Sequence, residues 1–131
     1  MTPHLAPVPD DGPFVYPIAK GDRLDGLSFV KWQHQRWLAS DFFMMGTAEC
    51  KGHARDLFDI AQMQSPPGTL SRDMAYLARL LRVDPAHFAE LCKLRFGPLH
   101  GWMPCVTQDG EPRLWHRTVL EQVQDAFDRR E

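Results

Sequence analysis

Five basic side chains lie within residues 71–96, close enough in sequence to form a surface that contacts the phosphates of a nucleic acid. They are Arg72, Arg79, Arg82, Lys93 and Arg95. Three acidic residues in the same stretch reduce its net charge to +2 (five basic minus three acidic). Each phosphate contact releases counterions, and Arg113 and Arg117 would add contacts from a neighbouring segment. The spacing predicts a weak phosphate-contacting face, and a solvated helix face is the alternative.

Three side chains in the segment after Val83 are candidates for reading base edges. On a helical wheel that starts at Pro85, His87, Glu90 and Lys93 point outward. Bases are read most often by Arg, Asn, Gln or Lys, so Lys93 fits best; Glu90 would repel phosphate unless it accepted a hydrogen bond from a cytosine amine. An ordinary surface role is the alternative for His87.

Cysteines and histidines could in principle form a metal site or a nucleophilic catalytic site, but their spacing argues against both. Cys50 and His53 share one helical face, and His100, Cys105 and His116 come later in the chain. Structural zinc usually takes a local pair of ligands at both ends of the site, and the second pair is missing. No third group marks a Cys–His nucleophile, and no glycine pattern marks a nucleotide site. We therefore expect no enzymatic activity and no cofactor.

The composition is that of one ordinary folded domain. The chain has 131 residues, 44% of them hydrophobic, with 15 Lys+Arg against 17 Asp+Glu and a net charge of −2. Bulk charge therefore gives no argument for nucleic-acid binding, and only local charge placement can. The three cysteines are odd in number and lack a CxxC motif, which favours reduced thiols. With no signal-peptide pattern and no long apolar run, we expect a cytoplasmic protein without a membrane partner.

Hydrophobic periodicity and turn residues predict the order of the elements. Residues 1–13 carry four of the eleven prolines and are expected to be a mobile arm, followed by a single domain over 14–131. Within that domain the predicted elements are an extended segment over 14–18, a short strand near 28–32, a short helix around 35–40, helices over 47–64, 72–82 and 85–96, two strands within 102–116 and a last helix.

Local signals set the ends of these elements. Thr47 and Ser71 are expected to cap their helices, and Asp84 followed by Pro85 marks a sharp new start. The dipeptide Asp109-Gly110 predicts a hairpin turn between the two strands. Thr118 is expected to open the last helix in a capping box.

This order is typical of a winged helix-turn-helix domain. The predicted fold is therefore mainly α (α+β), with a small β-hairpin and an extended N-terminal segment. In a DNA-binding version, the helix over 85–96 lies in the major groove and the hairpin tip, residues 107–113, touches the backbone.

Several motifs resemble the YdaU-like prophage proteins over about residues 14–127. They are Tyr16-Pro17, Trp37-Leu38, Thr47-Ala48-Glu49 with Gly52, Pro67-Gly68-Thr69-Leu70-Ser71, Leu77-Ala78-Arg79-Leu80-Leu81-Arg82-Val83 and Arg113-Leu114-Trp115-His116-Arg117. That family is similar in turn to the winged-helix N-terminal domains of phage replication initiators. The resemblance implies a phage-like origin and DNA binding. We therefore expect a non-catalytic protein that binds double-stranded DNA, as a transcriptional regulator or a replication accessory factor.

A protein-interaction adaptor that keeps this fold without reading bases is the alternative function. The aromatic segment 29–43 favours it, because exposed parts of Trp32, Trp37 and Phe42 would form a patch for a protein partner or a second copy. Burial of these rings under the helices is the competing interpretation.

Overall fold

The computed structural model describes residues 13–22 and 30–130, with six helices and a three-stranded sheet in that part of the chain. The helices are α1 (His34–Leu38), α2 (Asp41–Met45), α3 (Ala48–Gln62), α4 (Met74–Leu81), α5 (Pro85–Cys92) and α6 (Arg117–Arg130). The strands are β1 (Thr69–Leu70), β2 (Met103–Val106) and β3 (Pro112–Trp115). The expected mixed class with a small antiparallel sheet is confirmed. The arm over 1–13 lies, apart from Pro13, outside the described residues.

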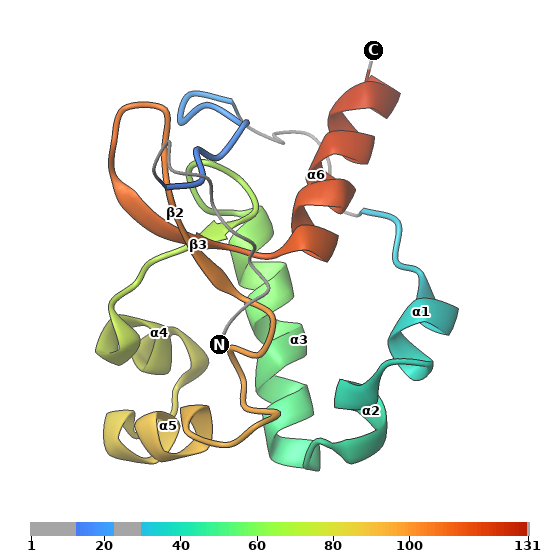
Figure 1. Ribbon diagram of the computed structural model, residues 1–131, viewed down its shortest axis with the longest axis vertical. Coiled ribbons are helices and arrows are strands. Elements are labelled where there is room, and N and C mark those ends of the chain that lie inside the picture. Colours follow the sequence, from blue (N-terminus) through green and yellow to red (C-terminus); the bar gives the residue numbers. More distant parts are fainter. Residues whose placement is uncertain (1–12, 23–29, 131) are drawn as a thin grey trace.

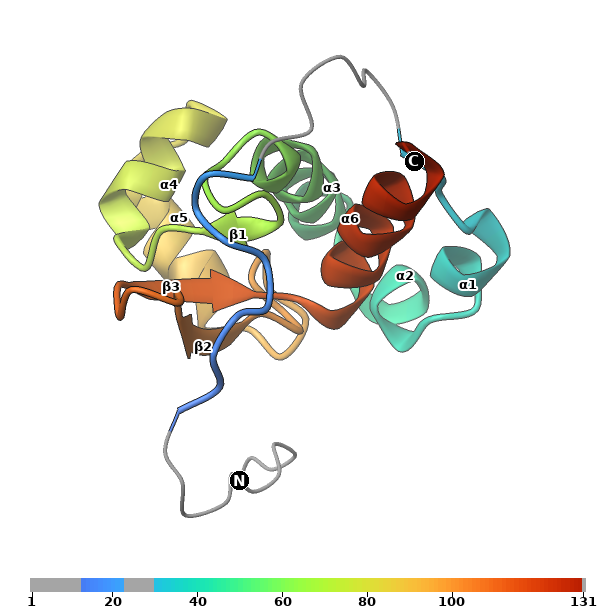
Figure 2. The same cartoon turned by 90° about the horizontal axis from the view of Figure 1, so that it is seen from above.

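Helix α3 is the central element of the fold. Its buried residues recur at helical spacing and are Cys50, Ala54, Leu57, Phe58 and Ala61. Helices α4 and α5 lie on one side of α3, whereas α1, α2 and α6 lie on the other (Figures 1 and 2). The main core combines Leu57 and Phe58 with side chains from α4, α5, α6 and β1. A second cluster seats Phe42 of α2 against Phe96 and Leu91.

The sheet has the strand order β1-β3-β2, and both pairings are antiparallel. The hairpin β2–β3 flanks Asp109-Gly110 as predicted, and Gly110 has a φ of 89°, which glycine adopts without strain. Strand β1 was not predicted, because two residues are too few to show an alternating pattern. Thr69 pairs with Trp115, so β1 exists only through its partner strand.

The extended N-terminal segment is confirmed. Tyr16 N donates to Val106 O at 2.9 Å, and Val106 N donates to Phe14 O at 3.0 Å. The Tyr16 side chain is fully buried and its hydroxyl donates to Pro67 O at 2.8 Å. Burial raises the pKa of this hydroxyl, so it remains a donor at every physiological pH. The segment is thereby fixed across the hairpin and the turn before β1.

Three predicted helix starts and ends were placed wrongly. Helix α4 begins at Met74, because Asp73 rather than Ser71 accepts hydrogen bonds from its first amides; Ser71 Oγ instead accepts from Asp73 N at 3.0 Å. Helix α6 begins before Thr118, since His116 Nδ1 accepts from Thr118 N at 3.1 Å. Helix α5 ends at Cys92 and not near Phe96. Phe96 lies after the helix, and its ring stacks on that of Phe42.

The aromatic segment differs from its prediction as well. It contains two short helices, of which α2 was not expected; Ser40 caps α2 by accepting from Phe43 N at 3.1 Å. Residues 30–32 are not in a strand, and the rest of the strand expected near 28–32 lies outside the described residues. Helix α2 could not be predicted, because the closely spaced aromatic residues of this segment show no clear helical period.

Candidate functional site

The connection between α4 and α5 is the sharp corner that the sequence predicted. Val83 N donates to Ala78 O at 2.9 Å, which closes the end of α4. Asp84 Oδ2 accepts from His87 N at 3.1 Å, and Pro85 takes the first position of α5. Only residues 82–84 lie between the two helices, so α5 leaves α4 in a new direction with its first turn exposed.

The candidate base-reading side chains in and just after α5 all form ion pairs within the chain. His87 Nε2 lies 2.7 Å from Glu49 Oε2, and this contact with His87 is the main reason that the pKa of Glu49 is lowered. Lys93 Nζ donates to Glu90 Oε2 at 2.9 Å. All four side chains are exposed, and pairs of this kind contribute little stability, so a stronger anion could displace them.

Arg72 and Arg113, both predicted to contact phosphates, use their guanidinium groups in hydrogen bonds within the fold, although Arg72 is exposed and Arg113 is half-buried. Arg72 precedes α4, and its Nε and Nη2 donate to Arg113 O at 3.0 Å and to Cys105 O at 2.6 Å. Arg113 donates from Nε to Thr69 Oγ1 at 3.1 Å and from Nη2 to Gln64 Oε1 at 3.0 Å. Burial lowers the pKa of Arg113. Their hydrogen bonds tie the hairpin to β1 and to the end of α3, a role that the sequence analysis missed.

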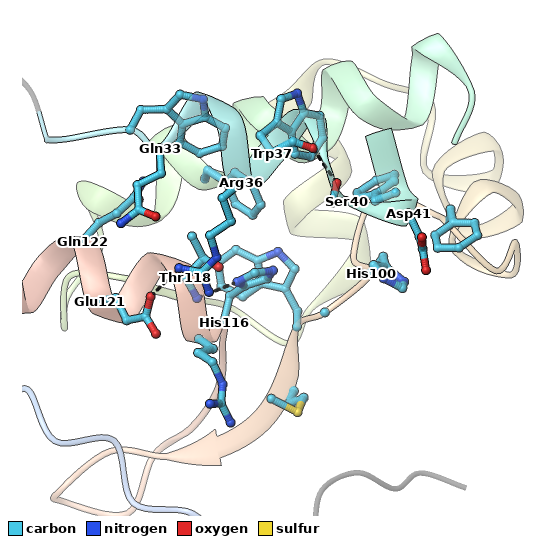
Figure 3. A pocket seen from close by; sticks show the side chains of 18 of the residues that line it. Gln33, Arg36, Trp37, Ser40, Asp41, His100, His116, Thr118, Glu121 and Gln122 are labelled. Carbon is cyan, nitrogen blue, oxygen red and sulfur yellow. Dashed lines mark hydrogen bonds and ion pairs between the residues drawn. The ribbon is translucent and has the colours of Figure 1, made fainter. Parts of the chain in front are cut away.

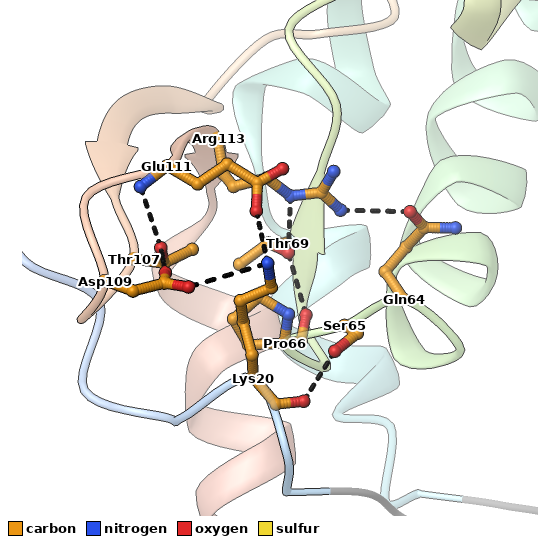
Figure 4. A network of polar contacts seen from close by, with 9 residues as sticks. All are labelled: Lys20, Gln64, Ser65, Pro66, Thr69, Thr107, Asp109, Glu111 and Arg113. Carbon is orange, nitrogen blue, oxygen red and sulfur yellow. Dashed lines mark hydrogen bonds and ion pairs between the residues drawn. The ribbon is translucent and has the colours of Figure 1, made fainter.

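The hairpin tip is acidic and neutralised from within the chain. Lys20 Nζ lies 2.8 Å from Glu111 Oε1 and 3.6 Å from Asp109 Oδ2 (Figure 4). Thr107 Oγ1 donates to Asp109 and accepts from Glu111 N, which fixes the turn. The tip presents no cation of its own for a phosphate.

Arg79 and Arg82 are the two predicted contacts that remain available at the corner. Both are exposed, and within the described part of the chain neither forms an ion pair. The Arg79 guanidinium lies 5.8 Å from the centre of the Tyr76 ring. Arg82 has a φ of 62°, in the left-handed region that favours glycine.

Arg117 lies in a different place from the corner. It is the first residue of α6 and lines a pocket of about 1030 Å³. The pocket is bounded by residues 31–42, by residues 95–103 and by the first turns of α6 (Figure 3). Aromatic rings form much of its wall, including the half-buried Trp32 and Trp37. The sequence analysis singled out these rings as a patch but had no signal for the pocket, because its walls come from three distant segments.

His116 lies in the wall of this pocket and stays neutral. Burial is the main reason that its pKa falls from 6.5 to about 4, and the neighbouring His100 and Arg36 act in the same direction. Because Nδ1 accepts from Thr118 N, the neutral ring carries its proton on Nε2.

Because the pKa of His116 is lowered, we expect the folded protein to lose stability in acid. Between about pH 6.5 and 4 the unfolded chain binds a proton that folded His116 does not, so the free energy of unfolding falls as the pH decreases through this window. We expect roughly 2–3 kcal/mol from this residue. Urea unfolding of wild type and His116→Asn at both ends of the window measures it, since asparagine keeps a cap acceptor but does not titrate. Equal pH dependence in the two proteins would contradict the assignment.

The thiols and histidines do not assemble a metal centre in the described residues. Cys105 is buried in a cluster with Tyr16 and Leu120, whereas Cys50, which shares α3 with His53, belongs to a different cluster. Burial raises the pKa of both Cys92 and Cys105 to about 11, so these thiols are protonated and are weak nucleophiles and ligands at neutral pH.

Comparisons with known proteins add no relative: no family model, no curated protein and no solved structure matches the chain. In the described residues, every helix is too short or too polar to span a bilayer.

Proposed function

We propose that the chain is a winged helix-turn-helix protein that binds double-stranded DNA without catalysing a reaction. In this proposal α5 enters the major groove and the hairpin β2–β3 is the wing. The observation that carries it is the capped corner at residues 82–84, which joins two short helices and leaves the first turn of α5 exposed. The strand order β1-β3-β2, with β1 directly before α4, supports the same assignment.

The proposed context is a phage-like protein of the cytosol, acting in transcription or as an accessory factor in replication. It rests on the resemblance to YdaU-like proteins over residues 14–127, and the three unbridged cysteines agree with a reducing compartment.

Arg79 and Arg82 are the proposed phosphate contacts. An arginine in the left-handed region costs about 1 kcal/mol relative to glycine, and residues retained in such strain are often functional. His87, Glu90 and Lys93 would then contact the bases after the His87–Glu49 and Lys93–Glu90 ion pairs are exchanged for contacts with DNA.

A salt titration with arbitrary duplex DNA tests the proposal. Wild type is expected to bind at low salt, with affinity falling steeply as salt rises. Arg79→Ala and Arg82→Ala are each expected to reduce the slope of log affinity against log salt by about one unit. Arg129→Ala, on α6, removes the same charge elsewhere and is expected to leave the slope unchanged.

Arg82→Gly separates the function of this residue from its structural cost. It is expected to raise the free energy of unfolding by about 0.5–1 kcal/mol while it weakens DNA binding. Absence of binding by wild type at low salt, or equal slopes for the α4 variants and Arg129→Ala, would overturn the proposal.

The protein-interaction adaptor remains the second candidate, and one observation favours it. Large apolar side chains are exposed on α4, where Tyr76 and Leu80 share the helix with Arg79, and Leu94 is exposed just after α5. If DNA does not bind at low salt, this surface becomes the first place to look for a protein partner.

A further inference from the structure

We propose that the pocket beside α6 is a binding site for a planar aromatic carboxylate, a function separate from DNA binding. Its volume of about 1030 Å³ is at the upper end of the range for small-molecule sites. Much of its lining comes from α1, α2 and α6, which lie on the side of α3 away from the α4–α5 corner (Figures 1 and 2). The argument depends on its walls, on its charges and on one unpaired donor.

The walls favour a flat aromatic body. Trp32 lies 6.0 Å from Trp37 and 5.8 Å from Phe58, measured between ring centres, with tilts of 54° and 44°. The Arg55 guanidinium stacks on Trp32 at 3.9 Å from the ring centre and holds that ring in place. Rings fixed in this way offer preformed π surfaces at little entropic cost.

The charges favour an anion, because four cations line the pocket against three acids, Asp41, Glu121 and Asp125, and the last two of these acids are paired with arginines. Glu121 accepts from Arg36 Nη1 at 2.7 Å (Figure 3), and Asp125 accepts from Arg129 Nε at 2.9 Å. Arg117 also lines the pocket and forms no ion pair within the described residues. As the first residue of α6, it lies where the helix dipole adds to its positive charge. The carboxylate would therefore bind at Arg117.

The wall of the pocket also contains a buried donor that has no acceptor. Trp102 lines the pocket and is nine-tenths buried, and its indole Nε1 has no hydrogen-bond partner in the described part of the chain. An indole nitrogen can only donate, and the neutral His116, whose ring centre lies 5.3 Å from that of Trp102, carries its proton on Nε2. A carboxylate supplies oxygens that accept from such groups.

Titration of the isotope-labelled chain, residues 1–131, with naphthoate tests the proposal by NMR. The indole N–H signals of Trp32, Trp37 and Trp102 are expected to shift to saturation. Trp115, which stacks on Phe14 outside the pocket, is expected to stay unmoved as an internal control. Naphthamide has the same ring without the charge and is expected to bind at least about tenfold more weakly.

Two arginine variants locate the carboxylate. Arg117→Gln is expected to weaken naphthoate binding about tenfold and to leave naphthamide unaffected. Arg79→Gln, on α4, is expected to change neither, although it weakens DNA binding. The spectrum without ligand shows whether each variant is folded. Shifts that do not saturate, equal movement of Trp115, or equal affinity for the two ligands would overturn the proposal, whatever the DNA titration shows.

Discussion

Phe88→Ala is expected to lower the free energy of unfolding by about 3–5 kcal/mol, the largest effect of any single change in the corner. Phe88 is fully buried and belongs to the main core together with Leu77 of α4 and Phe58 of α3. Its removal leaves a cavity where α5 meets the rest of the fold, and the surrounding helices can close it only in part. Urea unfolding followed by tryptophan fluorescence measures the loss.

Leu94→Ala is the matched control for this substitution. Leu94 follows α5 and is half exposed, so its truncation is expected to change stability by no more than about 0.5 kcal/mol. The slope of the unfolding free energy against urea has to stay constant for the comparison to hold. A loss below about 1 kcal/mol for Phe88→Ala would mean that α5 is not packed on α3 and α4 as described.

Signals within a few residues of each other were enough to predict the corner and the hairpin. Thr47 and Asp84 both cap their helices through their side chains, as expected from their positions. Asp109-Gly110 forms the predicted turn. In each of these places the residue that determines the cap or the turn lies within a few residues of it, so the sequence alone was sufficient to predict it.

The candidate site was predicted less well, because its geometry depends on contacts between distant segments. Arg72 and Arg113 read as surface cations in the sequence, yet their guanidinium groups are used by backbone and side-chain acceptors more than 30 residues away. The pocket has no local sign at all. Its aromatic wall was recognised as a group, but only the folded chain brings Trp37 close to the start of α6.

Gly68→Ala is expected to lower the free energy of unfolding by roughly 3 kcal/mol or more. Gly68 has a φ of 92°, which an alanine tolerates poorly. A Cβ at this position would collide with the Tyr16 hydroxyl and would lie 3.0 Å from Val123 Cγ2. Because Tyr16 is fully buried, the collision also displaces the hydrogen bond that it donates to Pro67 O. Thermal and urea unfolding both measure the loss.

Two further variants separate the backbone strain at Gly68 from the collision. Gly52→Ala on α3 meets nothing within 4 Å, so it is expected to stabilise the protein by about 0.5–1 kcal/mol. Tyr16→Phe removes the hydroxyl, and in that background Gly68→Ala is expected to cost less, leaving mainly the strain of the positive φ. An equal cost in both backgrounds would show that Tyr16 does not lie against the turn before β1. That result would contradict the attachment of the N-terminal segment to the fold.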